Sequence, residues 1–127
     1  ENDSMDMVVN HHSLEHVGCG GSDGFIREAY RVLKPEGKLL IFVPDMKALA
    51  KRWLIGELDE QLYMTNVYGA YMGDEADWHK WGYSREGLWK CLKRAAPWKD
   101  VKAFDWRVIA GADIAKDWWI NAMECVK

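Results

Sequence analysis

Residues 31–44, RVLKPEGKLLIFVP, decide how the middle of the chain folds. Leu39–Val43 is an unbroken apolar run next to turn residues, which is typical of a strand buried on both faces of a parallel sheet. Upstream, Met5–Val9 reads as a short strand, and Phe25–Leu33 places apolar residues at helical spacing. Strand, helix and strand predict one βαβ unit with a right-handed crossover.

The residues between the first strand and the helix carry turn chemistry. Gly18–Gly24 holds four glycines and is predicted to be a loop, after which Ser22 or Asp23 caps the helix. The helix is predicted to stop at the turn formed by residues 34–37, KPEG.

Downstream, the pattern alternates between helices and strands. Asp45 is expected to cap a helix over Met46–Ile55, and Ser84 a helix that ends before Pro97. Residues 57–83 are irregular, with a short helix near Glu60–Tyr68. Two closing strands are predicted, the first from residue 101 to 108 and the second from 118 to 126.

Composition limits the classes of protein. The 127 residues, 49% of them hydrophobic, suit one domain over residues 1–127. A net charge of −3 predicts no nucleic-acid partner. No apolar run approaches the ~20 residues of a membrane span, and no secretory leader is visible. Three widely spaced cysteines favour a reducing, cytoplasmic setting.

Two segments carry a resemblance to a known family. Residues 6–17, DMVVNHHSLEHV, resemble the fourth strand of class I S-adenosylmethionine-dependent methyltransferases and the turn after it. Residues 31–44 resemble the helix, Lys-Pro-Gly-Gly-like turn and fifth strand of that family, with Glu36 in place of the commoner first glycine. Residues 95–98, AAPW, are similar to the Ala-Gly-Phe ending of the family's last helix, with two residues replaced.

The resemblance implies an α/β fold, a partial Rossmann-like methyltransferase half-sheet. Its strands would be equivalent to strands 4, 5, 7 and 6 of the family, with flanking helices and an antiparallel last strand. It covers only the C-terminal half of the family's domain, and the glycine-rich cofactor loop would be absent. Gly18–Gly24 with Asp45 is an alternative cofactor loop. It is disfavoured because such a loop should directly follow an apolar strand.

The resemblance also implies site residues, because the end of the fourth strand lies beside the cofactor and the acceptor. Asn10 and His11 are expected to bind S-adenosylmethionine, and His11 or His12 to act as general base. His79 is the second candidate for the base. Residues 57–83 are expected to form a lid-like insertion over the acceptor, with substrate-binding residues Asn66, Tyr68, Trp78, His79, Trp81 and Tyr83. For each, capping a turn or packing a lid is the alternative role.

The remaining expectations concern metals, partners and activity. No Glu-x-x-His or Cys-x-x-Cys spacing supports a metal site. An exposed edge at Met5–Val9 predicts a homodimer or a partner chain that pairs with this strand. The expected reaction is methyl transfer to a small-molecule acceptor. The alternative is a non-catalytic truncated module that acts in binding or oligomer assembly.

Overall fold

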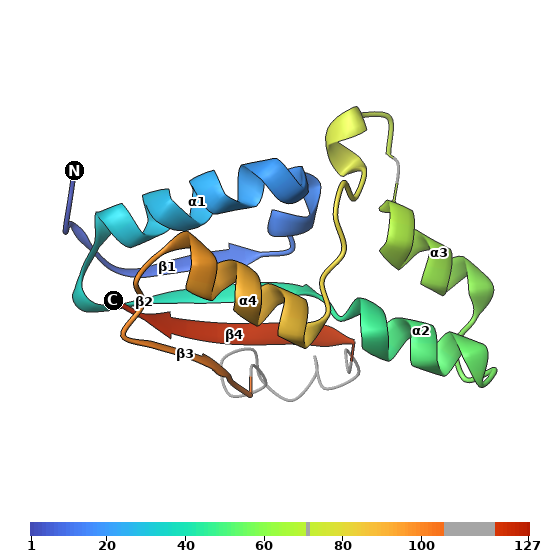
Figure 1. The fold of residues 1–127 in the computed structure, drawn as a ribbon. Helices are drawn as coiled ribbons and strands as arrows, with labels where there is room; N and C mark the ends of the chain where they lie inside the picture. Colours follow the sequence, from blue (N-terminus) through green and yellow to red (C-terminus); the bar gives the residue numbers. More distant parts are fainter. Residues whose placement is uncertain (71, 106–118) are drawn as a thin grey trace.

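A computed structural model describes residues 1–70, 72–105 and 119–127. Its strands and helices follow one another along the chain as β1 (Met5–His11), η1 (Leu14–His16), α1 (Gly18–Val32), β2 (Leu33–Pro44), α2 (Met46–Leu54), α3 (Glu60–Tyr68), η2 (Glu75–Asp77), α4 (Arg85–Ala95), β3 (Asp100–Ala103) and β4 (Ile120–Val126). Figure 1 shows α1 and α4 on one face of the sheet, and α2 and α3 beyond its end.

The four strands form one mixed sheet in the order β1-β2-β4-β3. β1 runs parallel to β2, whereas β4 is antiparallel to both β2 and β3. This is the order and the mixed direction that the resemblance implies, and the predicted α/β fold class is confirmed. The parallel strands β1 and β2 end at the same edge, where η1 and α2 begin (Figure 1).

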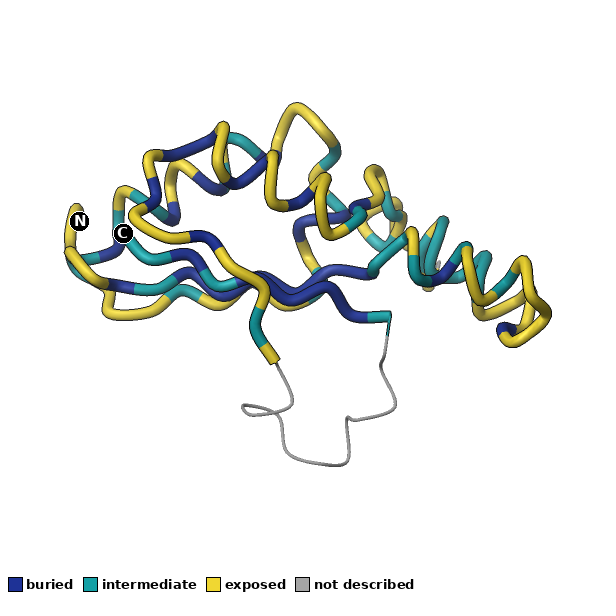
Figure 2. The backbone as a smooth tube through the Cα atoms, turned by 60° about the horizontal axis from the view of Figure 1, so that its bottom comes forward, coloured by how far each residue is buried: buried dark blue, intermediate teal, exposed yellow. Residues whose placement is uncertain are grey.

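The main core lies between the sheet and the pair α1 and α4. Leu39, Ile41 and Val43 of β2 point into it and are fully buried, as the apolar run predicts. On the other face a smaller cluster groups Leu40 and Phe42 with residues of β4. Figure 2 shows the burial concentrated in the central strands, with exposed backbone along α2 and α3.

The predicted start of the first long helix is wrong. α1 begins at Gly18, so the glycine cluster forms its first two turns rather than a loop. Ser22, expected to be a cap, is buried inside the helix, where its hydroxyl lies 3.9 Å from the Cys91 thiol of α4. Packing against α4 therefore outweighs the poor helix propensity of glycine.

The boundaries of the strands also differ from those predicted. β2 begins at Leu33, so the KPEG turn lies within it as an irregularity, with Glu36 at φ 65° and a register jump between Met5 and Met7 of β1. β3 ends at Ala103, earlier than predicted, and residues 106–108 of the predicted strand lie outside the described residues. β4 begins at Ile120, and Trp118 also lies outside them.

The predicted caps of α2 and α4 are confirmed, whereas Ser22 and Asp23 lie inside α1. Asp45 Oδ1 accepts hydrogen bonds from the N–H groups of Lys47 and Ala48, at 3.1 and 3.2 Å. Ser84 Oγ accepts one from Gly87 at 3.1 Å.

Across the described ranges, no helix has the length and apolar character needed to cross a membrane.

Candidate functional site

The site is centred on the carboxyl end of β1. Asn10 is buried there, and its side-chain Oδ1 has no hydrogen-bond partner among the described residues. His12 follows the strand at φ 48°, an uncommon conformation for a residue with a Cβ, and its N–H donates to the Phe42 carbonyl at 3.0 Å. The chain thus turns sharply where the strand ends.

His12 is held by a buried carboxylate. Its Nδ1 lies 3.2 Å from Oε1 of Glu15, a residue of η1 that is only 1% exposed. An ionised carboxylate can accept hydrogen bonds but cannot donate them. The proton of the neutral imidazole must therefore sit on Nδ1. Nε2 of His12 is then left with a lone pair that can accept a proton.

The segment after η2 is attached to the same turn. The backbone carbonyl of Glu15 accepts hydrogen bonds from the N–H groups of Lys80 and Trp81, at 2.8 and 3.0 Å. Nδ1 of His16 lies 3.2 Å from the Trp78 carbonyl. These contacts place residues 78–81 against η1, in the region where the segment leads down to α4 (Figure 1).

His79 links this segment to α3. Its Nδ1 lies 2.7 Å from the Asn66 carbonyl, and its N–H donates to the Tyr68 carbonyl at 3.0 Å. Its ring meets that of His16 edge to face, with centroids 4.8 Å apart. Each of Glu15, His16 and His79 offers a metal-ligating atom, and these atoms lie within 4.8 Å of one another.

The structure therefore brings together some predicted site residues and separates others. Asn10 and His12 lie at the strand end, and Asn66, Trp78 and His79 lie beside η1. His11 is exposed and packs its ring 5.2 Å from that of Phe42.

The remaining predicted residues differ widely in exposure. Tyr68 and Trp81 are 66% and 46% exposed, whereas Tyr83 is 3% exposed and belongs to the main core. Burial raises the pKa of the Tyr83 phenol to about 12. Its side chain thus acts as part of the packing that supports the segment rather than as part of its surface.

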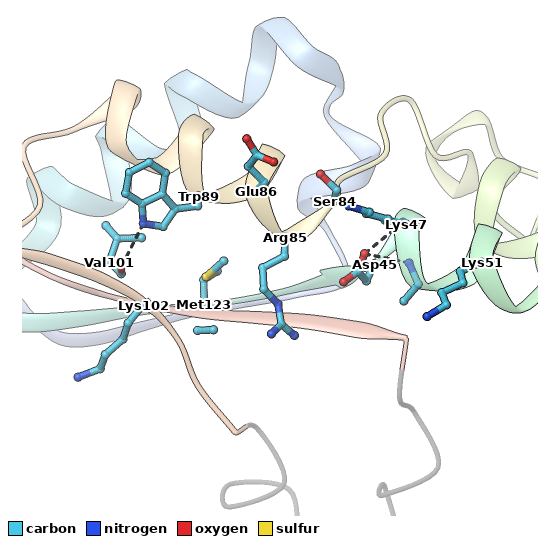
Figure 3. A pocket seen from close by; sticks show the side chains of 12 residues that line it. Asp45, Lys47, Lys51, Ser84, Arg85, Glu86, Trp89, Val101, Lys102 and Met123 are labelled. Atoms are coloured by element: carbon cyan, nitrogen blue, oxygen red, sulfur yellow. Dashed lines mark hydrogen bonds between the residues drawn. The ribbon is translucent and has the colours of Figure 1, made fainter.

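A pocket of about 660 Å³ lies between α2, α4 and the β3–β4 strands, away from η1. Figure 3 shows Asp45 and Ser84, the two helix caps, at one end, and Trp89 at the other, with its Nε1 donating to the Val101 carbonyl at 3.2 Å. Its charged lining residues are Asp45, Lys47, Lys51, Arg85, Glu86 and Lys102. This pocket was not predicted from the sequence. Its only signal there was the pair of caps, each followed by basic residues.

Comparison with known proteins supports the fold. Residues 1–41 match the model of the methyltransferase domain family. The whole fold is similar to that of a SAM-dependent methyltransferase from Archaeoglobus fulgidus, with a TM-score of 0.58 and 15% identity over 99% of this chain and 61% of that one. A comparison with curated protein sequences gives no match.

Two further structures have the same fold. One is the 1,6-didemethyltoxoflavin-N1-methyltransferase of Burkholderia thailandensis, solved with S-adenosylhomocysteine, with a TM-score of 0.57 and 16% identity over 100% of this chain and 45% of that one. The other is human N-acetylserotonin methyltransferase, solved with SAM, with a TM-score of 0.56 and 16% identity over 96% of this chain and 29% of that one.

The family match at residues 1–41 confirms the resemblance to class I S-adenosylmethionine-dependent methyltransferases over that part of the chain, and the solved structures confirm the fold. The chain spans 29% to 61% of the length of these three structural relatives.

Proposed function

We propose that this chain contributes to S-adenosylmethionine-dependent methyl transfer onto a small-molecule acceptor. The observation that carries the proposal is the arrangement at the end of β1. The buried Asn10 amide oxygen has no hydrogen-bond partner in the described part of the chain, and it lies two residues from a histidine whose imidazole is held by the buried Glu15 carboxylate. Ligands of open α/β sheets bind at the carboxyl ends of the strands, where this arrangement lies.

The residues at this edge fit the cofactor. An acceptor buried without a donor costs about 1–3 kcal/mol, and a bound amino or hydroxyl group would remove that cost at Asn10. S-adenosylmethionine carries both kinds of donor and, when bound, supplies an electrophilic methyl group. Asn10 and the neighbouring His11 are the residues that we assign to holding it.

His12 is the residue that we assign as general base. With its Nδ1 proton directed at Glu15, Nε2 is available to remove a proton from an acceptor hydroxyl or amine. Glu15 orients the imidazole through this contact. His79 is the second candidate, because its Nδ1 donates to the Asn66 carbonyl and leaves Nε2 in the same state.

The exposed aromatic residues of the predicted lid are assigned to the acceptor. Tyr68, Trp78 and Trp81 are each about half exposed or more, and all three lie near η1 or on α3. Flat aromatic surfaces of this kind suit an apolar or ring-containing small molecule. Asn66 and Tyr83 complete the predicted set. Asn66 contacts His79 through its backbone carbonyl, and Tyr83 is buried beneath the segment.

Calorimetric titration of the 127-residue chain with S-adenosylhomocysteine tests the assignment. We expect S-adenosylhomocysteine to bind with a micromolar Kd. Asn10→Leu should weaken this binding about tenfold, because the variant no longer offers a buried acceptor to the ligand. Cys19→Ala, an exposed change on α1, is the matched control and should bind as the unmodified chain does. Absence of binding at millimolar ligand contradicts the proposal and favours the assembly role below.

The second candidate function is assembly with another copy of this chain. Met5, Met7 and Val9 share one face of β1 and are 51%, 52% and 56% exposed. Within the described residues β1 pairs with β2 alone, so its outer edge is available for strand pairing. Light scattering after chromatography should show a dimer that Met7→Lys converts to a monomer. A monodisperse monomer of the unmodified chain contradicts the dimer.

A further inference from the structure

We propose that Glu15, His16 and His79 form a binding site for a divalent transition metal of the Zn²⁺ type. The inference does not depend on the proposed methyl transfer. It follows from three features of these side chains: their mutual distances, the hydrogen bonds of the two imidazoles, and the burial of the carboxylate. Two imidazoles and one carboxylate are a ligand set that Zn²⁺ accepts while keeping a fourth position open.

The hydrogen bonds fix the tautomer of both histidines. Nδ1 of His16 lies 3.2 Å from the Trp78 carbonyl, and Nδ1 of His79 lies 2.7 Å from the Asn66 carbonyl. A carbonyl oxygen only accepts, so each Nδ1 must carry the proton. Both imidazoles therefore present a lone pair on Nε2. A backbone carbonyl on the second nitrogen is the usual support of a metal-binding histidine.

Glu15 supplies the anionic ligand. Its side chain is 1% exposed, and its Oε2 has no hydrogen-bond partner within the described part of the chain. A buried carboxylate oxygen without a donor is unfavourable, and a cation would satisfy it. The other oxygen, Oε1, accepts from Nδ1 of His12 at 3.2 Å. Ligating carboxylates are commonly supported by such a hydrogen bond.

The three ligands are held by separate parts of the fold. Glu15 and His16 lie on η1, and the Glu15 carbonyl accepts the N–H groups of Lys80 and Trp81, next to His79. One potential ligand atom of each residue lies within 4.8 Å of those of the other two. Bond lengths of about 2.0–2.1 Å place tetrahedral Zn²⁺ ligands roughly 3.4 Å apart, so the cluster would contract by side-chain rotation.

The site would have a specific effect on the fold. His79 belongs to the segment between α3 and α4, and His16 follows the first strand, so one ion would cross-link parts of the chain that are far apart in sequence. Both imidazoles are half-buried, which leaves the ion accessible from solvent. This ligand set draws on two segments that are distant in the sequence, so it has no close Glu-x-x-His or Cys-x-x-Cys spacing.

Titration of the chelator-treated 127-residue chain with Zn²⁺ and Co²⁺ tests the site. We expect one equivalent of Zn²⁺ to bind with a micromolar or lower Kd and to raise the Tm, because only the folded chain holds the three ligands together. Co²⁺ should give the intense visible bands of a four-coordinate ion. Binding weaker than millimolar, or only the pale spectrum of hexahydrated Co²⁺, overturns the proposal.

Variants distinguish this cluster from the other histidines. Glu15→Gln, His16→Asn and His79→Asn should each weaken Zn²⁺ binding by about 100-fold or more. Loss of a residue that only hydrogen-bonds to a ligand typically weakens binding by about 10–100-fold. His11→Gln, at an exposed position outside the cluster, should change it less than about twofold. Equal losses in His11→Gln and His16→Asn overturn the proposal.

A measurement on the unmodified chain covers the case in which a variant does not fold. In ¹⁵N-labelled protein, Zn²⁺ should shift the Nε2 resonances of His16 and His79 and leave those of His11 unchanged. Shifts confined to His11 and His12 would place the ion elsewhere and overturn the proposal.

Discussion

Nδ1 of His12 lies 3.2 Å from Oε1 of Glu15, and the two residues belong to the short connection between β1 and α1. The contact predicts that the neutral imidazole of His12 carries its proton on Nδ1, whereas free imidazole side chains favour Nε2–H. Long-range ¹H–¹⁵N spectra report the tautomer directly. In Glu15→Ala the acceptor is lost, and we expect the Nε2–H form to dominate. A predominant Nε2–H form in the unmodified chain would contradict the observed contact.

Tyr83 predicts a dependence of stability on alkaline pH. Burial raises the pKa of its phenol from 10 to about 12, so the protonated form favours the folded state. This stabilisation is complete below pH 10 and is lost as the pH rises to about 12, by an amount on the order of 2 kcal/mol. Tyrosinate absorbance should show a late titration step that is absent in Tyr83→Phe. A complete titration of all tyrosines near pH 10 in the folded chain would be the contrary result.

Replacing Gly69 by alanine should destabilise the fold much more than replacing Gly56. Its φ is 87°, and an added Cβ would overlap the backbone carbonyl of Asp77, next to the segment that carries His79. Gly56 has φ 74° but open space around it. We expect Gly69→Ala to lower the free energy of unfolding by about 2–4 kcal/mol and Gly56→Ala by about 1 kcal/mol. Urea denaturation measures both, and equal losses would show that the overlap is relieved.

Asp45 predicts a moderate effect at the start of α2. Its carboxylate accepts the N–H groups of Lys47 and Ala48. Asp45→Ala should cost about 1 kcal/mol of stability in urea denaturation, and Asn at this position should restore most of it, since Asn is an equally good cap. If Asp45→Asn costs as much as Asp45→Ala, the charge rather than the hydrogen bonds matters.

The cysteines predict a simple pattern of reactivity. Cys19 is exposed, whereas Cys91 and Cys125 are buried, and burial raises the pKa of both buried thiols, for Cys125 to about 12. Because the thiolate is the reactive form, Ellman's reagent should modify Cys19 rapidly in the folded chain and the other two only after unfolding. Cys19→Ala should abolish the rapid phase.

The fold followed from local patterns because the deciding elements are strongly marked. The apolar run of β2 and the helical spacing in α1 predicted the βαβ unit, and capping residues predicted the start of α2 and α4. The start of α1 was predicted incorrectly because the low helix propensity of glycine reflects local sequence only, whereas contacts distant in sequence fix this helix. The contact of Ser22 with Cys91 that helps to fix this helix joins segments 69 residues apart.

The candidate site was predictable only in part, for a related reason. The end of β1 and the 57–83 region both contained polar and aromatic residues, so each could be assigned separately. Their contact depends on backbone groups that carry no sequence signal, such as the Glu15 carbonyl that binds Lys80 and Trp81. The pocket beside α4 was missed because its lining comes from short stretches of four elements, α2, α4, β3 and β4.

The Tyr68 carbonyl accepts from the His79 N–H and the Glu15 carbonyl from Lys80 and Trp81, so the segment before α4 is held at His79 and directly after it. Residues 72–77, which include η2, precede this anchored stretch. In evolution, insertions or deletions there would change the length of the segment between α3 and α4 while His79 keeps its place beside η1. Relatives of this chain would then differ most in length at residues 72–77, and such differences would leave the end of β1 unchanged.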